Sequence, residues 1–350
     1  MYVAVEILLF VACLVLVLGA SEFLARGIDR IGSKLHLTDE LVGVLTALGA
    51  DSPEISSAIV ALLSSRRDLG VGIVLGSNLF NLAALLGLGA VVAGEVSARS
   101  RATIFNGSVA VAVTLVAGAL INGYLSPVPA TILMLLIIIP YIYILSVGSR
   151  GVERMKLPGA SKRFLIDATQ ETKRETEEIA EQRKQRERKD RAIRKEQEEQ
   201  SWKPALWVLP ALAVIVLGSI GLIKYATVLG HGWLPEAVLG TFVLASLTGL
   251  PNSLTAVRLA RNGNGAAVIT ETFNSNTINL LVGLLLPALI FGEGSPDQLV
   301  LFDIGALVLT TMVAVVLSAH ASKLTRIQGA IVIALYLAFI GGWIVLFLGK

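Results

Sequence analysis

Two carboxylates stand beside a proline in an otherwise apolar stretch of this sequence. Asp51 and Glu54 flank Pro53 in the segment GADSPEISSAIV, and their spacing of three places them on nearly one face of a helix. A carboxylate without a partner at mid-membrane costs at least about 2.5–3.5 kcal/mol, and two neighbouring carboxylates also repel each other. A cation held between them, or a proton shared by them, would remove that cost.

A second segment repeats the pattern without the charges. LTGLPNSLTAVR and NSNTINL correspond to GADSPEISSAIV and GSNLFNL at one constant offset, 198 residues along the chain. The offset pairs Pro53 with Pro251, Ser77 with Ser275, Asn78 with Asn276 and Asn81 with Asn279. Two motifs that keep one register indicate an internal duplication.

Both segments offer oxygen atoms to a cation. A proline has no N–H, so Pro53 and Pro251 each leave a carbonyl one turn earlier, on Gly49 and Leu247, without its helical donor. Ser77, Asn81, Ser275 and Asn279 add hydroxyl and amide oxygens. An all-oxygen set with two carboxylates suits a hard cation such as Ca²⁺, Na⁺ or Mg²⁺. We expect Asn78 and Asn276 to form hydrogen bonds between helices instead.

The composition places these segments in a membrane. Hydrophobic residues make up 54% of the 350 residues, and 16 of the 29 Lys and Arg and 12 of the 26 Asp and Glu lie between Arg150 and Lys203. The remainder is nearly free of charge. Because that charged stretch mixes both signs, it argues against nucleic-acid binding, and the single Cys13 excludes a disulfide framework.

Ten apolar runs of about 20 residues are each long enough to cross the hydrocarbon core. They lie near Val3–Ala25, Asp39–Leu63, Leu69–Gly94, Ala102–Ile121, Pro127–Val147, Pro204–Leu229, Leu234–Ala260, Gly265–Phe291, Gln298–Ala319 and Ile327–Phe347. The sequence therefore predicts an all-α membrane protein of ten transmembrane helices in three parts. These are a five-helix half (1–148), a charged loop (149–203) and a second five-helix half (204–350).

The Lys and Arg at the span edges predict the orientation. With the N-terminus outside, the cytoplasmic edges carry Arg26, Arg30, Lys34, Arg99, Arg101, Arg258, Arg261, Lys323 and Arg326, and the outer edges only Arg66, Arg67, Lys224 and Lys350. The loop is then cytoplasmic. Five spans per half is an odd number, so the two halves enter the membrane from opposite sides, which is the inverted-repeat plan of secondary transporters.

The loop itself predicts a helix without a core. Asp167–Gln200 is rich in Glu–Lys/Arg pairs at helical spacing but offers only Ile179 and Ile193 as large apolar anchors. A solvated helical linker is the favoured interpretation, and an arm that makes regulatory or partner contacts is the alternative.

At these motifs the chain resembles the sodium/calcium exchanger family of the cation/Ca²⁺ antiporter superfamily. The family pattern G-T-S-x-P-E, followed by G-S-N-x-x-N or -D, corresponds to residues 49–54 and 76–81, and more loosely to residues 247–252 and 274–279. The resemblance implies ten spans in two inverted halves. It assigns the main acidic ligand to Glu54 and a serine position to Asp51. In the second repeat it assigns ligands to Thr248, Asn252, Ser275 and Asn279.

Charge is distributed differently from the family pattern. The second repeat has Asn252 in place of glutamate and Asn279 where many relatives carry aspartate, whereas the first repeat has gained Asp51. Two carboxylates on one side of the site match one divalent cation better than three Na⁺. Glu271, four residues before Ser275 on the same face, could compensate, or it could be an interfacial carboxylate near Arg258 or Arg261.

The sequence thus predicts a multi-pass protein of the plasma or inner membrane whose partners are inorganic cations and lipid. The expected activity is exchange of Ca²⁺ or a similar divalent cation for Na⁺ or H⁺ by alternating access, without a cofactor. A Na⁺/H⁺ or Mg²⁺ exchanger is the first alternative, and a scaffold or sensor that does not transport is the second. An enzyme is not expected, because no nucleophile–base pair or His-bearing metal motif lies within a span.

Overall fold

The computed structural model describes residues 2–34, 47–174, 206–291 and 298–348, and these residues are almost entirely helical. In the first half, the elements are α1 (Tyr2–Lys34), α3 (Ser52–Leu63), α4 (Arg67–Asn81), η1 (Leu82–Leu88), α5 (Gly89–Ala93), β1 (Glu95–Ser97), α6 (Ser100–Ile121) and α7 (Pro127–Arg154). Residues 47–50 and 159–174 are also helical.

The second half has a similar series of helices, but its strand comes one helix later in the order. It contains α10 (Val208–Gly230), α11 (Glu236–Val238), η2 (Leu239–Leu244), α12 (Ala245–Arg261), α13 (Gly265–Ile278), η3 (Asn279–Leu285), α14 (Leu286–Phe291), α15 (Gln298–Ala319), η4 (His320–Ser322), β2 (Lys323–Thr325) and α16 (Arg326–Leu348). The segments η1, η2 and η3 are π-helical. They continue the spans that contain α4, α12 and α13, at positions that the hydropathy pattern does not mark.

Nine helices in the described part of the chain are long and apolar enough to cross a membrane. The predicted polytopic helical protein is therefore confirmed. The expected span Asp39–Leu63 begins outside the described residues, and its remainder forms the shorter apolar helix Ser52–Leu63. The count of ten spans accordingly stays a prediction.

One small sheet departs from the all-α prediction. Strands β1 and β2 pair antiparallel, with Val96 opposite Leu324, and Arg326 donates its backbone N–H to Gly94 at 2.9 Å. Both strands are connections between spans, so each supplies the backbone partners that the other would otherwise take from water. This sheet fixes the end of α5 beside the start of α16.

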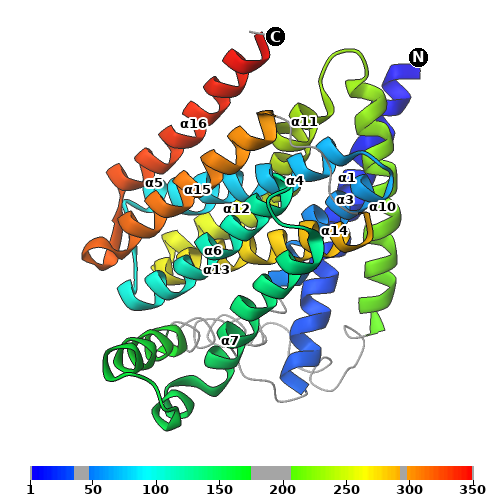
Figure 1. Ribbon diagram of the computed structural model, residues 1–350. Coiled ribbons are helices and arrows are strands. Elements are labelled where there is room, and N and C mark those ends of the chain that lie inside the picture. Colours follow the sequence, from blue (N-terminus) through cyan, green and yellow to red (C-terminus); the bar gives the residue numbers. More distant parts are fainter. Residues whose placement is uncertain (1, 35–46, 175–205, 292–297, 349–350) are drawn as a thin grey trace.

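Helix α4 occupies the centre of the bundle, where helices from both halves surround it (Figure 1). Glycines allow the closest approach. A Cβ at Gly76 would lie 2.2 Å from the carbonyl oxygen of Thr241 in η2, and one at Gly72 would lie 2.9 Å from the Thr241 hydroxyl. The first repeat and the start of the second repeat therefore touch backbone to backbone.

Helices α1 and α10 run side by side along one side of the bundle (Figure 1). Val17, Ala20 and Leu24 of α1 pack with Ala211 and Ile215 of α10 in a hydrophobic cluster that is separate from the main core. These two helices, the first of each half, thus share a small cluster of their own, and Leu222, Ile223 and Ala226 of α10 also belong to the main core.

Part of the charged loop packs on the bundle. In the helical stretch 159–174, the carboxylate of Glu171 accepts the backbone N–H groups of Arg101 and Ala102 at 3.0 Å each. Asp167 forms an ion pair with Arg101 at 2.7 Å, and Ala168 is fully buried. This stretch therefore caps the first turn of α6 instead of lying wholly in solvent. The remainder of the expected loop helix, 175–200, lies outside the described residues.

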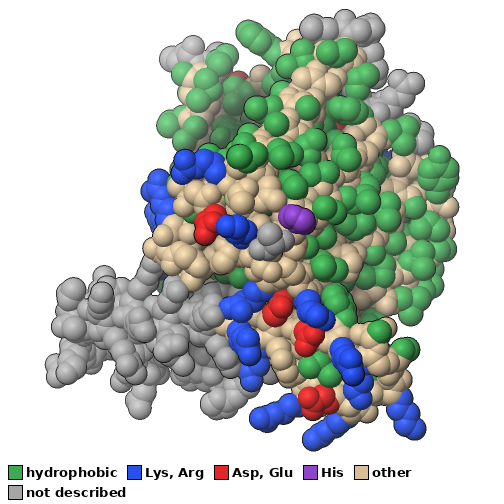
Figure 2. Space-filling view, turned by 90° about the vertical axis from the view of Figure 1, so that its left-hand side faces the viewer, with side chains coloured by type: hydrophobic (Ala, Val, Ile, Leu, Met, Phe, Trp, Pro, Cys, Tyr) green, Lys and Arg blue, Asp and Glu red, His purple; other side chains and the backbone are tan. Residues whose placement is uncertain are grey.

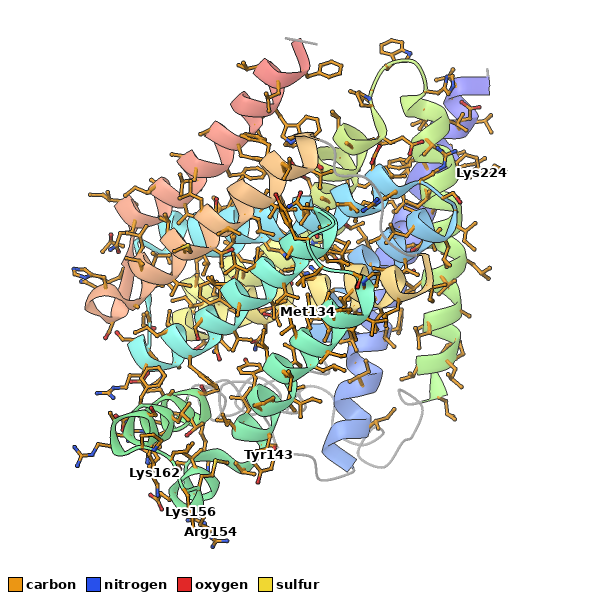
Figure 3. The ribbon with its side chains drawn as sticks, in the orientation of Figure 1. Met134, Tyr143, Arg154, Lys156, Lys162 and Lys224 are labelled. Carbon is orange, nitrogen blue, oxygen red and sulfur yellow. The ribbon has the colours of Figure 1, made fainter. Side chains whose placement is uncertain are left out.

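The charges of the loop mark one end of the molecule. Lys and Arg side chains gather on the lower part of the face shown in Figure 2, and Arg154, Lys156 and Lys162 lie at the opposite end of the bundle from Lys224 (Figure 3). The contacts agree with the predicted topology. Strand β1 pairs with β2 and Arg101 pairs with Asp167, and all four were expected at the same membrane face. Which of the two faces is cytoplasmic stays a prediction.

Candidate cation site

The two repeats meet through a reciprocal pair of asparagines. The side-chain amide of Asn78 donates to the backbone carbonyl of Asn276 at 3.1 Å, and the amide of Asn276 donates to the carbonyl of Asn78 at 3.2 Å. Both side chains are buried. These residues are equivalent at the repeat offset, so the contact lies where α4 and α13 are related by the symmetry of the duplication.

Asn81 and Asn279 lie at equivalent junctions, where α4 passes into η1 and α13 into η3. Asn81 donates its amide to the Ser275 hydroxyl at 3.0 Å, and Asn279 donates to the side-chain oxygen of Asn78 at 3.2 Å. In both residues the side-chain oxygen is buried and has no hydrogen-bond donor among the described residues. Irregular turns of this kind recur at functional sites.

The carboxylates lie at the start of α3. Asp51 precedes the helix, Pro53 occupies its first turn, and Glu54 follows. Asp51 is 2% exposed and Glu54 1%. Asp51 accepts the amide of Asn252 at 2.8 Å through one oxygen. Its other oxygen and both oxygens of Glu54 are buried without a donor in the described part of the chain.

The prolines act differently in the two repeats. In the first, helix 47–50 is interrupted at Asp51, and the hydroxyl of Ser52 donates to the Gly49 carbonyl at 2.7 Å. That carbonyl, expected to lack a donor, is therefore hydrogen-bonded, because a side chain replaces the missing N–H. In the second, α12 runs on through Pro251. The Leu247 carbonyl cannot receive a bond from that proline nitrogen.

Two candidate hydroxyl ligands, Ser77 and Thr248, lie on α4 and α12. Ser77 donates to the carbonyl of Val74 at 3.1 Å, and Thr248 donates to that of Leu244 at 2.8 Å. Both side chains are buried. Each hydroxyl donates its proton to a carbonyl of its own helix, so the lone pairs of its oxygen remain available to a cation.

Glu271 lies on α13 and interacts electrostatically with Asp51. It is partly buried, which separates it from a fully solvated surface carboxylate. Within the described residues, no three Asp, Glu, His or Cys side chains are placed to hold a metal ion together. Amide and hydroxyl oxygens must therefore complete any cation site around Asp51 and Glu54.

Tyr141, Asn106 and Asp303 are among the buried polar residues outside the repeats that the sequence prediction did not include. The Tyr141 hydroxyl of α7 contacts the side-chain oxygens of Asn106 on α6 and Asn274 on α13. Asp303 of α15 accepts hydrogen bonds from Trp343 and Thr241. A polar side chain within an apolar span was the available signal in each case.

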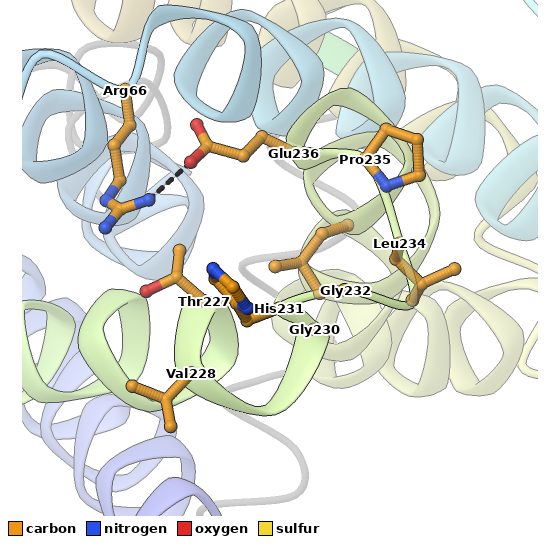
Figure 4. Close-up of a pocket in the computed structure, with 10 residues that line it drawn as sticks. Arg66, Thr227, Val228, Gly230, His231, Gly232, Leu234, Pro235 and Glu236 are labelled. Carbon is orange, nitrogen blue, oxygen red and sulfur yellow. Dashed lines mark hydrogen bonds and ion pairs between the residues drawn. The ribbon is translucent and has the colours of Figure 1, made fainter.

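A cavity of about 590 Å³ lies at another place, between the end of α10 and the start of α11 (Figure 4). An ion pair between Arg66 and Glu236 borders it, and His231 and Thr227 also line it. Arg66 follows Glu54 by twelve residues of mostly helical chain, or about 18 Å. The cavity is therefore separate from the carboxylates.

The family comparison matches both halves of the chain. The sequence profile described as sodium/calcium exchanger protein matches residues 5–147 and again residues 203–345. The two matches leave out most of the charged loop.

Curated relatives match over different lengths. The inner membrane protein YrbG of Escherichia coli (strain K12) is 25% identical over 82% of this chain and 81% of its own length. The putative antiporter CaxA of Alkalimonas amylolytica is 36% identical over 23% of this chain, and the match spans 25% of CaxA. The sodium/potassium/calcium exchanger 3 of Rattus norvegicus is 27% identical over 29% of this chain and 16% of its own.

Two solved structures share the fold. An H⁺/Ca²⁺ exchanger, CAX, superposes with a TM-score of 0.68 at 14% identity and covers 96% of this chain and 81% of its own. The sodium-calcium exchanger NCX_Mj superposes with a TM-score of 0.59 at 18% identity, over 97% of this chain and 99% of its own.

Proposed function

Because the chain belongs to the sodium/calcium exchanger protein family, we propose that it is a secondary antiporter that exchanges Ca²⁺, or a similar divalent cation, for Na⁺ or H⁺. Membership of this family makes it a membrane transporter and not an enzyme. The transported ions, the ligands and the coupling are the parts that we propose here.

One observation carries the proposal. Among the described residues, six buried carboxylate and amide oxygens without donors belong to five side chains of the two repeats: one on Asp51, two on Glu54, and one each on Asn81, Asn276 and Asn279. Buried polar atoms are nearly always hydrogen-bonded, so such a group of unpaired acceptors calls for a positively charged partner. Carboxylate and amide oxygens together are the donor set of Ca²⁺ and related hard cations.

The proposed ligand set combines charged and neutral groups. Asp51 and Glu54 supply the charge, and the neutral oxygens come from Ser77, Asn81, Thr248, Asn252, Ser275 and Asn279. Asn252 points its amide nitrogen at Asp51, so only its oxygen is left for a cation. Glu271 would supply a third carboxylate from α13; it repels the charge of Asp51, and a cation between the two would relieve that repulsion.

The packing of α1 against α10 supports alternating access. The small cluster around Val17 and Ile215 holds this pair together, while Leu222, Ile223 and Ala226 of α10 pack into the main core. A shear motion of this pair would keep the α1–α10 cluster intact and slide the contacts of α10 with α3. We infer that the α1–α10 pair moves relative to α3, α4, α12 and α13, and so exposes the carboxylates to one face at a time.

The alternatives differ in what they transport. A Na⁺/H⁺ or Mg²⁺ exchanger would use the same oxygens with another ion, and a scaffold or sensor would bind a cation without moving it. The capping contact of Glu171 shows that part of the loop packs on α6, and it favours neither alternative over transport.

Transport into vesicles tests the proposal. Purified protein is reconstituted into liposomes, and uptake of radiolabelled Ca²⁺ is measured under an outward Na⁺ gradient, an outward H⁺ gradient, and neither. Gradient-driven uptake that is lost in Glu54→Gln supports the antiporter. Uptake of neither Ca²⁺ nor Mg²⁺ under any gradient, from protein that is folded and correctly inserted, would overturn it.

A further inference from the structure

A hydrogen-bonded bridge outside the two repeats holds the ligand helix α13. Tyr141 of α7 is 6% exposed, and its hydroxyl lies 2.7 Å from the side-chain oxygen of Asn274 and 3.1 Å from that of Asn106. Asn106 in turn donates its amide to the Thr270 hydroxyl at 3.3 Å. A hydroxyl carries one proton, and the shorter contact assigns that proton to Asn274.

The bridge contacts one face of α13, and the first repeat contacts the opposite face. Thr270 and Asn274 are four residues apart, and so they share one face of the helix. Ser275, Asn276 and Asn279, which contact Asn81 and Asn78, lie on another face. A rotation of α13 about its axis would therefore break contacts on one side or the other.

The two repeats differ at this position. The residue equivalent to Asn274 in the first repeat is Gly76, where the chain is fixed by direct backbone contact with Thr241. The second repeat replaces that steric contact with a side-chain hydrogen bond to a helix outside the repeats. The hydroxyl of Tyr141 thus fixes the rotation of α13, as close backbone packing fixes that of α4.

We propose that Tyr141 is a positioning residue of the cation site: through Asn274 it sets the face of α13 that presents Ser275 and Asn279. This inference rests on the proposed function, since it concerns the same site. Tyr141 lies outside both repeat motifs, so the comparison of the two motifs does not identify it. It contacts no candidate ligand itself and acts on them through Asn274.

Tyr141→Phe removes the hydroxyl and little else, because the ring packs against Phe105 with a centroid separation of 5.3 Å. Tyr143→Phe is the matched control: Tyr143 lies two residues along α7 and is 56% exposed (Figure 3). We expect Tyr141→Phe to raise the half-saturating Ca²⁺ concentration about five- to tenfold. The maximal rate should stay within about twofold, and Tyr143→Phe should change neither.

A double-mutant cycle separates positioning from general destabilisation. Asn274→Ala should raise the half-saturating concentration as Tyr141→Phe does, and the double variant should be no worse than the more affected single variant. Unchanged saturation in Tyr141→Phe, or effects that multiply in the double variant, would overturn the proposal.

A binding measurement keeps this test distinct from that of transport. The rise in melting temperature of the detergent-solubilised protein is recorded against Ca²⁺ and Na⁺ concentration for wild type, Tyr141→Phe and Tyr143→Phe. If wild type binds a cation but does not transport it, the proposed antiport fails. A higher half-saturating concentration confined to Tyr141→Phe then still supports its positioning role, and equal binding by all three proteins refutes it.

Discussion

Asn78 and Asn276, 198 residues apart in the chain, each donate a side-chain amide to the other's backbone carbonyl. Asn78 also accepts the amide of Asn279, so it makes two side-chain hydrogen bonds across the repeats where Asn276 makes one. The contact is symmetric in the backbone and asymmetric in the side chains.

This asymmetry predicts an order of stability. Interhelical hydrogen bonds in membrane proteins contribute about 0.6 kcal/mol each on average. Asn78→Ala, which loses two, should therefore lower the melting temperature of the purified protein more than Asn276→Ala, which loses one. Asn262→Ala, at an exposed helix end, is the control and should be close to neutral. Equal effects at Asn78 and Asn276 would contradict the assignment of the second bond.

The two carboxylates should differ in importance. Glu54→Gln removes the carboxylate with both oxygens unpaired, and we expect divalent uptake to fall to background while folded protein remains in the membrane. Asp51→Ser restores the family's residue and should weaken affinity or shift ion preference more gently. Asp68→Asn, at an exposed position of α4, should leave uptake within about twofold. Normal uptake by Glu54→Gln would show that the site is assigned wrongly.

The bond between Asn252 and Asp51 predicts that the charge can be exchanged between the repeats. Asn252→Asp alone places two carboxylates in contact across a 2.8 Å bond, and Asp51→Asn alone removes one of the two charges. The double variant Asp51→Asn/Asn252→Asp keeps the number of charges and the hydrogen bond. It should therefore recover Ca²⁺ affinity relative to both single variants in the same uptake assay. A double variant whose Ca²⁺ affinity is as low as that of Asn252→Asp would show that the charge cannot be moved between the two positions.

The number of fixed charges predicts nearly electroneutral exchange. Asp51 and Glu54 together are neutralised by one divalent cation, two monovalent cations or two protons, whereas three Na⁺ would leave a net charge in a low-dielectric site. A membrane potential clamped with K⁺ and valinomycin should then change the rate of Ca²⁺ uptake little. Strong acceleration by the potential would contradict this and show that Glu271 or another acid supplies a further charge. If that acid is Glu271, Glu271→Gln should remove the voltage dependence.

The orientation can be read by cysteine labelling. After replacement of Cys13 by serine, a single cysteine at Lys156 should react with a membrane-impermeant maleimide only from the cytoplasmic side. A single cysteine at Trp233, which is 85% exposed, should react only from outside. Labelling of both positions from one face would refute the inverted arrangement of the two halves.

The class of this protein and the position of its candidate site follow from the sequence alone. The length of each apolar run is a local property, and it marks the spans directly. The constant offset between the two motifs is also visible in one dimension, so it identifies Asp51, Glu54, Ser77 and Asn81 together with their partners in the second repeat. The family match confirms the class of the protein, and the shared fold agrees with it, whereas the site residues stay a prediction.

Local sequence patterns did not predict which hydrogen-bond partners the polar groups have, or where the helices become irregular. The carbonyl of Gly49, expected to lack a donor, accepts the hydroxyl of Ser52, whereas α12 runs on through Pro251. The π-helical turns after Asn81 and Asn279 have no marker in the hydropathy pattern.

Which oxygens of the candidate site remain unpaired depends on the tertiary structure. Asn252 turns its amide to Asp51, and Asn81 turns its amide to Ser275, because the crossing of helices from opposite halves brings those pairs within hydrogen-bond distance. The same crossing brings Tyr141 to Asn274 across 133 residues of chain. Spacing along one helix fixes which face a residue occupies, but a hydrogen bond between helices depends on their separation and rotation, which follow from the packing of the whole bundle.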